Sequence, residues 1–233
     1  MPEQGSTTEP TTIPEALHAA AERWPDDEAV VGDDGERWTF AELLDRSRAV
    51  ARALVASGVQ QGDRVALWAP NSAWIATSFG TYLAGAVLVP LNSRYKGEEA
   101  AHVLRTSEAR LLVTVTDLLG RSLLAELDGV GDLPALEERV VLAGPTADGA
   151  LAWAAFLARR DGVTDTVVDD WAAAVGPDDR SDIIFTSGTT GAAKGRSSAT
   201  APACGSTRRG PGRSASATTT ATSSSTRSST PRA

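Results

Sequence analysis

Residues 182–195 read Asp-Ile-Ile-Phe-Thr-Ser-Gly-Thr-Thr-Gly-Ala-Ala-Lys-Gly. The first four residues predict a short apolar strand, and the ten that follow predict a loop. Gly188, Gly191 and Gly195 permit positive φ and close backbone approach, so that successive N–H groups can face one anion. Lys194 adds a point charge suited to a polyphosphate. A strand that runs directly into such a loop predicts a binding site for ATP phosphates or pyrophosphate.

Hydroxyl side chains complete this candidate site, because each can donate to a phosphate oxygen. The candidate phosphate-binding residues are Thr186, Ser187, Gly188, Thr189, Thr190, Gly191 and Lys194. The pattern is not the usual P-loop, since Ala193 and Gly195 flank the lysine where that motif has Gly and then Ser or Thr. A bare Ser/Thr/Gly run is often only a flexible connection, but the complete string after a strand favours phosphate binding. No metal site is predicted, because the acid pairs Asp33-Asp34 and Asp169-Asp170 are typical of solvated turns.

Apolar strands alternate with helical segments in the residues before the loop. Thr39 and Glu42 have the spacing of a capping box, and residues 33–35 predict a hairpin turn. The expected helices cover residues 13–24, 40–57, 73–84, 97–106, 118–127 and 150–160. The expected strands cover residues 28–31, 37–38, 64–68, 86–89, 111–115, 139–142 and 182–185, and residues 167–170 are expected in an acidic linker. This alternation predicts an α/β fold with a mostly parallel sheet flanked by helices on both faces.

Composition excludes several classes of protein. The chain of 233 residues carries a formal net charge of −8, which argues against nucleic acid or an anionic membrane as a partner. The only cysteine is Cys204, so no disulfide framework is expected. His18 and His102 are expected at the surface. No stretch approaches the roughly 20 apolar residues of a membrane span, and residues 1–4 lack the start of a signal peptide, so a cytoplasmic location is expected.

The last segment, residues 196–233, contains only Ser, Thr, Ala, Arg, Pro, Gly and Cys. All of these have codons with C or G at the second position. Lysine occurs only at Lys96 and Lys194 while arginine is abundant, which indicates a GC-rich gene. Reading such a gene one base late would give this composition. Synonymous codons can be chosen for residues 214–231 so that the frame starting one base earlier encodes Val-Gly-Leu-Arg-Asp-Asp-Asp-Arg-Tyr-Leu-Val-Val-Asn-Pro-Phe-Phe-His-Thr. The segment is therefore interpreted as a disordered, out-of-frame tail.

The string from Thr186 to Gly195 resembles the phosphate-binding signature of the adenylate-forming enzymes, which include acyl-CoA synthetases, luciferases and peptide-synthetase adenylation domains. That family usually has Pro where Ala193 stands. Residues 90–95 are most similar to the fatty acyl-CoA synthetase branch, including enzymes that act on sterol-ring propionates. Further segments resemble family landmarks in their usual order: Thr39-Phe40-Ala41-Glu42-Leu43, Gly62-Asp63-Arg64-Val65-Ala66, Pro70-Asn71 and Gly85-Ala86-Val87-Leu88-Val89-Pro90-Leu91-Asn92.

The resemblance implies an incomplete N-terminal part of the adenylate-forming fold. Residues 1–12 would be a loose N-terminus, residues 13–195 a partial adenylation domain and residues 196–233 the disordered tail. The family joins a carboxylic acid to AMP from ATP with Mg²⁺ and then transfers the acyl group to coenzyme A. The hydroxyls of the loop and Lys194 would steady the β- and γ-phosphates during this attack.

The remaining functional parts of the family lie further along the chain: the adenine and ribose contacts, the Mg²⁺-binding glutamate, the acyl pocket and the small C-terminal domain. The chain is therefore expected to be an N-terminal fragment of an ATP-dependent acyl-CoA synthetase of fatty acid metabolism. It would lack a complete catalytic site and be inactive by itself. A small non-catalytic nucleotide- or phosphate-binding protein is one alternative. An interaction protein with an Arg/Ser tail is another. The acyl substrate and the oligomeric state do not follow from the sequence.

Overall fold

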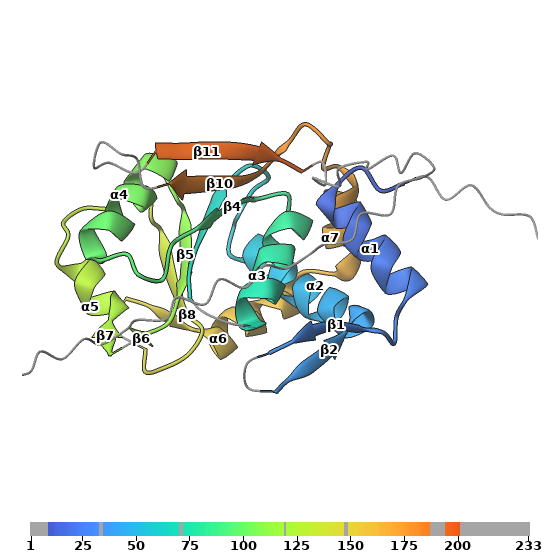
Figure 1. The fold of residues 1–233 in the computed structure, drawn as a ribbon, viewed down its shortest axis with the longest axis horizontal. Helices are drawn as coiled ribbons and strands as arrows, with labels where there is room; N and C mark the ends of the chain where they lie inside the picture. Colours follow the sequence, from blue (N-terminus) through green and yellow to red (C-terminus); the bar gives the residue numbers. More distant parts are fainter. Residues whose placement is uncertain are drawn as a thin grey trace, which may run out of the picture. The chain divides into compact units, whose positions relative to one another are not determined.

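The computed structural model describes residues 9–32, 35–69, 72–118, 120–146, 149–186 and 194–200, with the side chains of residues 72, 73 and 194 excepted. A seven-stranded sheet with the order β11-β10-β4-β3-β5-β8-β9 forms its centre (Figure 1). Every neighbouring pair in this sheet is parallel except β10 and β11. Its strands are β3 (Arg64–Trp68), β4 (Val87–Pro90), β5 (Leu111–Thr114), β8 (Glu138–Val141), β9 (Leu151–Ala152), β10 (Arg180–Thr186) and β11 (Lys194–Ala199).

Two crossover connections around β3 set the layers. The chain runs from β3 through α3 (Ser72–Leu83) to β4, and then through α4 (Gly97–Ser107) to β5 on the other side of β3. Because such crossovers are almost always right-handed, the change of direction puts the two helices on opposite faces. Figure 1 shows α3 grouped with α1, α2 and α7, and α4 grouped with α5 across the sheet. These further helices are α1 (Ile13–Arg23), α2 (Phe40–Ala56), α5 (Leu123–Asp128) and α7 (Asp165–Ala173). The predicted α/β sheet is confirmed.

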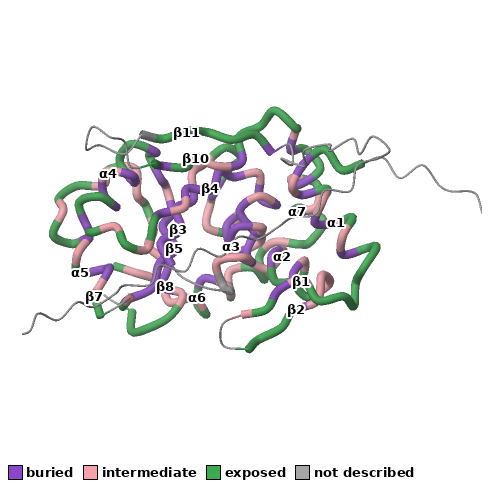
Figure 2. Tube along the Cα trace, in the orientation of Figure 1, coloured by how far each residue is buried: buried purple, intermediate pink, exposed green. Residues whose placement is uncertain are grey.

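The core lies between the sheet and the two groups of helices. Val65 to Trp68 of β3 and all of β5 are buried, and Figure 2 shows buried residues along β3, β5 and β8. Continuous apolar strands are typical of a sheet that is covered on both faces. On one face, α2 and α3 pack closely at Gly80, where a Cβ would lie 2.6 Å from the Cβ of Val50. Only glycine permits this approach.

Capping boxes begin the first two helices. The hydroxyl of Thr39 accepts the N–H of Glu42 at 3.3 Å, and the Glu42 carboxylate accepts the N–H of Thr39 at 2.9 Å. Thr12 and Glu15 form the same pair at the start of α1. The predicted box at Thr39 is confirmed. Thr12 is also ordered by its cap, although it lies in the segment of residues 1–12 predicted to be loose.

Short hairpins flank the main sheet. β1 (Glu28–Val31) and β2 (Arg37–Thr39) pair antiparallel, as predicted, and the turn residues 33–34 lie outside the described residues. A second hairpin, β6 (Asp117–Leu118) with β7 (Arg121–Ser122), replaces the first part of the helix predicted over residues 118–127. Arg121 forms an ion pair with Glu126 at 2.5 Å across the start of α5, which holds this turn against the helix.

Two further boundaries differ from the sequence prediction. Residues 151–152 add β9 to the edge beside β8, and the helix predicted over residues 150–160 is α6 (Trp153–Ala158) followed by a 3₁₀ turn (Arg159–Gly162). The acidic linker predicted around residues 167–170 is part of α7. Val168 is buried there, and the Asp169 carboxylate pairs with Arg48 of α2 at 3.0 Å. Asp169 is therefore a helical ion-pair partner and not a residue of a solvated turn.

The predicted start of the tail at residue 196 is wrong. β11 continues to Ala199, and Thr200 is buried beyond it. The N–H of Thr200 donates to the carbonyl of Asp179 at 2.8 Å, and its own carbonyl accepts the N–H of Ile13 at 3.1 Å. Composition missed this strand because its ladder is made by backbone groups and needs no apolar side chains. Residues 201–233 lie outside the described residues.

Candidate functional site

The candidate phosphate loop leaves the sheet at the carboxyl edge of its parallel strands. β10 runs parallel to β4 with Asp182 opposite Leu88, and β4 runs parallel to β3. Thr186, the last residue of β10, therefore lies at the same edge as Pro90 and Trp68, which end β4 and β3. In open α/β sheets, ligands bind beyond this edge. The fold thus brings the two ends of the loop, Thr186 and Lys194, to the edge where the sheet geometry favours a ligand.

The two ends of the loop are paired. Thr186 lies opposite Lys194 in the antiparallel ladder of β10 and β11, and Thr186 is exposed. For Lys194 the structure describes the backbone alone. The candidate residues Ser187, Gly188, Thr189, Thr190 and Gly191 lie outside the described residues, so their contacts with phosphate stay a prediction.

Two tyrosines position β10. The phenol of Tyr82 on α3 donates to the Asp182 carboxylate at 2.7 Å, and the Tyr95 hydroxyl lies 3.5 Å from the carbonyl oxygen of Phe185. Burial raises the pKa of Tyr82, and its hydrogen bond to Asp182 raises it further, so the phenol remains a donor. Burial likewise raises the pKa of Tyr95, with a smaller contribution from Glu99. Sequence reasoning assigned neither tyrosine, because each contact joins residues about a hundred positions apart.

Hydrogen bonds also fix the other turns at this edge. The indole N–H of Trp68 donates to the carbonyl of Asn92 at 3.1 Å, and the hydroxyl of Thr114 donates to the carbonyl of Trp68 at 2.9 Å. The Asn92 side chain accepts the N–H of Arg94 at 2.9 Å, which forms a tight turn after β4. Arg94 forms no ion pair with any side chain in the described ranges. A cation on this turn adds favourable potential for an anion at the same edge.

Other kinds of site find little support in the part of the chain that the structure describes. No group of three or more His, Cys, Asp or Glu side chains is placed there to hold a metal ion. None of the helices described is long and apolar enough to cross a membrane. His18 is half-buried rather than on the surface, and its Nε2 has no hydrogen-bond partner among the described residues.

A family model described as AMP-binding enzyme matches residues 17–198. The chain belongs to this family. The match extends over the fold from α1 to β11 and includes the loop between β10 and β11. It therefore agrees with the structure in assigning the first residues beyond 195 to the folded body.

Two curated relatives of this chain are propanoyl:CoA ligases whose acyl group carries a 7a-methyl-1,5-dioxo-octahydro-indenyl ring. The ligase of Rhodococcus jostii is 42% identical over 199 residues, which cover 83% of this chain and 38% of the relative. The ligase of Mycobacterium tuberculosis is 42% identical over 185 residues, which cover 79% of this chain and 36% of the relative. The chain thus spans little more than a third of the length of these relatives.

Solved structures share the fold of this chain. The N-terminal domain of FACL13 from Mycobacterium tuberculosis, solved with an inhibitor, has a TM-score of 0.67 and 26% identity over 82% of this chain and 44% of that one. The anthranilate CoA ligase AuaEII, solved with anthranoyl-AMP, has a TM-score of 0.64 and 26% identity over 81% of this chain and 34% of that one. The predicted relationship to acyl-CoA synthetases is confirmed, and the chain covers only their N-terminal part.

Proposed function

We propose that the chain is the phosphate-binding N-terminal portion of an ATP-dependent acyl-CoA ligase. The observation that carries this proposal is the pairing of Thr186 with Lys194 at the carboxyl edge of the sheet, in a chain of the AMP-binding family. In the complete enzyme a carboxylate attacks the α-phosphorus of ATP, which forms acyl-AMP and releases pyrophosphate. The thiol of coenzyme A then takes the acyl group and releases AMP.

The loop's own residues bind and orient phosphate in this proposal. The exposed hydroxyl of Thr186 donates to a phosphate oxygen, together with Ser187, Thr189 and Thr190. Gly188 and Gly191 let the backbone N–H groups approach the same oxygens, and Lys194 supplies the charge. Mg²⁺ carried by ATP neutralises part of the triphosphate charge. These groups position and stabilise the transferring phosphates without a covalent step.

Adenylation requires more than this portion of the enzyme. The chain spans 38% of the Rhodococcus jostii ligase, and a loop that holds phosphate provides no grip on adenine or on the acyl group. We expect the 233-residue chain to bind ATP weakly and to form no acyl-AMP. The first acids to test are fatty acids and ring-bearing propionic acids, because the relatives with 42% identity act on an acid of the second kind.

The test compares the only two lysines in two forms of the protein. One form is the 233-residue chain; the other comes from a gene with one base restored after the codons of β11. We expect that the restored protein catalyses acid-dependent exchange of pyrophosphate into ATP and that the 233-residue chain does not. Lys194→Ala should reduce this exchange at least about 100-fold, as loss of a transition-state contact does. Lys96→Ala should leave the exchange nearly unchanged.

Three results would count against the proposal. Exchange catalysed by the unrestored chain would show that it is complete as it stands. Equal exchange rates for the Lys194 and Lys96 variants of the restored protein would show that the loop does not act on phosphate. ATP binding by the restored protein without exchange, for every acid tested, would favour the small nucleotide-binding protein instead.

A further inference from the structure

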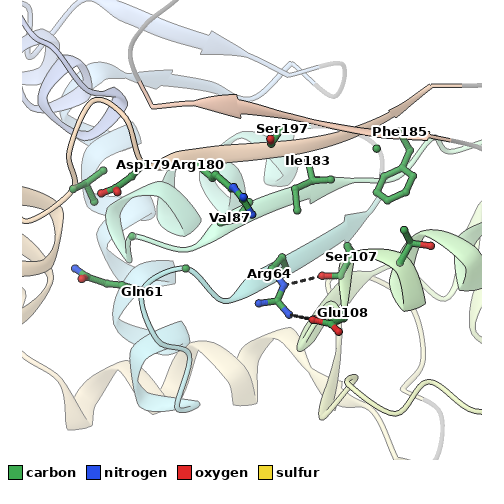
Figure 3. Close-up of a pocket in the computed structure, with 15 residues that line it drawn as sticks. Gln61, Arg64, Val87, Ser107, Glu108, Asp179, Arg180, Ile183, Phe185 and Ser197 are labelled. Carbon is green, nitrogen blue, oxygen red and sulfur yellow. Dashed lines mark hydrogen bonds and ion pairs between the residues drawn. The ribbon is translucent and has the colours of Figure 1, made fainter.

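Two cavities of the fold differ in how their polar groups are satisfied. The larger, of about 740 Å³, lies beneath β10, and Figure 3 shows the side chains that line it. Arg64 donates there to the carbonyl of Ser107 at 2.7 Å and to the carboxylate of Glu108 at 3.1 Å. The smaller, of about 400 Å³, is lined mainly by residues of β2, α2, α3 and α6. Its volume is that of a small-molecule site, and one of its polar groups lacks a partner in the described part of the chain.

The unsatisfied group of the smaller cavity is the indole N–H of Trp38. Trp38 lines the cavity and is only 4% exposed, and its Nε1 has no hydrogen-bond partner among the described residues. The indole of Trp68, in contrast, donates to the carbonyl of Asn92. A buried donor without an acceptor is costly, so nearly all such groups in folded proteins are paired. Trp38 therefore indicates a ligand that carries an acceptor.

The uncharged residues that line this cavity are otherwise apolar. Val50 and Ala49 of α2, Ala76 of α3 and Leu157 of α6 belong to it. A buried water molecule needs roughly two to four polar partners, and these side chains offer none. An apolar molecule with a single acceptor suits this lining better than water does.

A second tryptophan gives the cavity a flat wall. The ring of Trp153 stacks on the buried Phe156, with 5.2 Å between the ring centroids and 27° between the planes. Trp153 and Leu157 are four residues apart on α6, so both present their side chains on one side of the helix. Aromatic side chains pack well against other rings in offset or edge-to-face arrangements. The wall therefore favours a ligand that contains a ring.

The charges at the rim of the cavity balance. Two acidic residues and two arginines lie there, all exposed: Glu36, Asp45, Arg46 and Arg160. Arg46 pairs with Glu36 at 3.1 Å, and its Cζ lies 4.4 Å from the centre of the Trp38 ring. An ionised ligand would lose water on entry and meet no net opposite charge. The lining therefore selects an uncharged ligand.

We propose that this cavity binds a small, uncharged, ring-bearing ketone. The carbonyl oxygen of the ligand accepts the indole N–H of Trp38, and its ring lies against Trp153. Because the N–H is buried, the ligand reaches it by displacing a neighbouring side chain, and such rotamer changes are common on binding. The site does not depend on the proposed function, since none of its lining residues in the described ranges belongs to β10 or β11, which flank the phosphate loop.

The test uses the 233-residue chain and two probes that differ by one oxygen, acetophenone and ethylbenzene. Each is titrated into isotope-labelled protein, and the indole N–H signals of the six tryptophans are followed by heteronuclear NMR. Acetophenone should shift the signal of Trp38, which is identified by its loss in Trp38→Phe. It should bind at least about fivefold more tightly than ethylbenzene, the gain expected from one hydrogen bond.

Matched variants separate the donor from the apolar space. Trp38→Phe keeps an aromatic ring but lacks the donor, so it should bind the two probes equally. Trp24→Phe should keep the preference for acetophenone, because Trp24 is exposed and does not line the cavity. Ala49→Leu fills the cavity and should weaken the binding of both probes, whereas Ala154→Leu, exposed on α6, should weaken neither. If Trp38→Phe does not fold, the Trp38 signal is assigned from nuclear Overhauser effects and Ala49→Leu becomes the deciding variant.

Equal affinities for acetophenone and ethylbenzene in the unmodified chain, or a preference that persists in Trp38→Phe, would overturn the proposal. Failure of both probes to bind would overturn it as well. Benzoate is the ionised probe of similar size, and tighter binding of benzoate than of acetophenone would show that the site takes an anion instead.

Discussion

Tyr82 and Asp182 join α3 to β10 through a 2.7 Å hydrogen bond across 100 positions of sequence. Asp182 lies four residues before Thr186, so this contact holds the strand that leads into the phosphate loop. Apart from β4 and β11, the described part of the chain gives β10 few other neighbours. The contact is therefore placed to fix where the loop begins.

Tyr82→Phe should destabilise the fold by about 1 kcal/mol, because it removes the hydrogen bond and leaves a half-buried carboxylate without its donor. The control is Tyr95→Phe, which removes a hydroxyl at the long distance of 3.5 Å from its acceptor and should cost less. Urea unfolding followed by circular dichroism measures both. A larger loss for the Tyr95 variant would contradict the importance given to the Tyr82 contact.

Thr39→Ala should destabilise the fold by about 1 kcal/mol, since the hydroxyl caps the N–H of Glu42 at the start of α2. Thr164 is a matched control because it occupies the same position before α7 but makes no side-chain capping hydrogen bond. Thr164→Ala should therefore change the free energy of unfolding by only a few tenths of a kcal/mol. Equal losses for the two variants would mean that the capping geometry has no energetic role.

Gly80→Ala should destabilise the fold by about 1–3 kcal/mol, although alanine is the better helix former. Its Cβ would lie 2.6 Å from the Val50 side chain and 2.9 Å from the carbonyl oxygen of Ser47, which cannot move without shifting α2. Gly162→Ala serves as the control, since nothing lies within 4 Å of the added atom. Thermal unfolding of the two variants should separate them by several degrees, and coincident melting curves would refute the close packing of α2 on α3.

Acid should weaken the fold through His18. Burial lowers the pKa of His18 and Arg48 of α2 lowers it further, against Asp169 of α7 and Glu22 of α1, which raise it. The folded pKa is thus below the ordinary value of 6.5, so the unfolded chain binds the proton first. The free energy of unfolding should fall as the pH drops below 6.5 and level off once His18 is protonated in the folded state.

Urea midpoints at pH 7.5 and pH 5.5, in the chain and in His18→Gln, measure this effect. The variant should lose less stability between the two pH values than the chain does, because it lacks the titrating group. The opposite sign would indicate that the ion pair with Asp169, whose carboxylate oxygen lies 3.7 Å from the imidazole, dominates over burial.

Local signals were sufficient for the parts of the fold that depend on neighbouring residues. The apolar runs of β3 and β5, the glycines between elements and the capping box at Thr39 each act over a few positions, and the structure has the predicted elements there. α7 was missed because its acidic residues suggested a linker. Its helix is stabilised by the burial of Val168 and by Asp169 with Arg48 on a distant helix, neither of which is visible in a local window.

For the candidate site, too, the sequence predicted the local features and not the contacts between distant segments. The glycines, hydroxyls and lysine between Thr186 and Gly195 indicated phosphate binding from residue chemistry alone. The pairing of Thr186 with Lys194, the contacts of Tyr82 and Tyr95 and the cavity beneath β10 depend on segments that only the folded chain brings together. The low-complexity composition beyond residue 195 also concealed β11, because antiparallel pairing is specified by backbone geometry as much as by side chains.

Because Thr186 pairs with Lys194, the two ends of the intervening loop stay together as long as β10 and β11 are paired. The entropic cost of closing a loop grows slowly with its length, so doubling the number of residues in this loop would cost only about 0.6 kcal/mol. The register of the β10–β11 ladder is more strictly limited than the length of the loop. A slip of one residue along the ladder would turn Lys194 to the opposite face of the ribbon. The loop can therefore vary in length during evolution as long as the register that pairs Thr186 with Lys194 is kept.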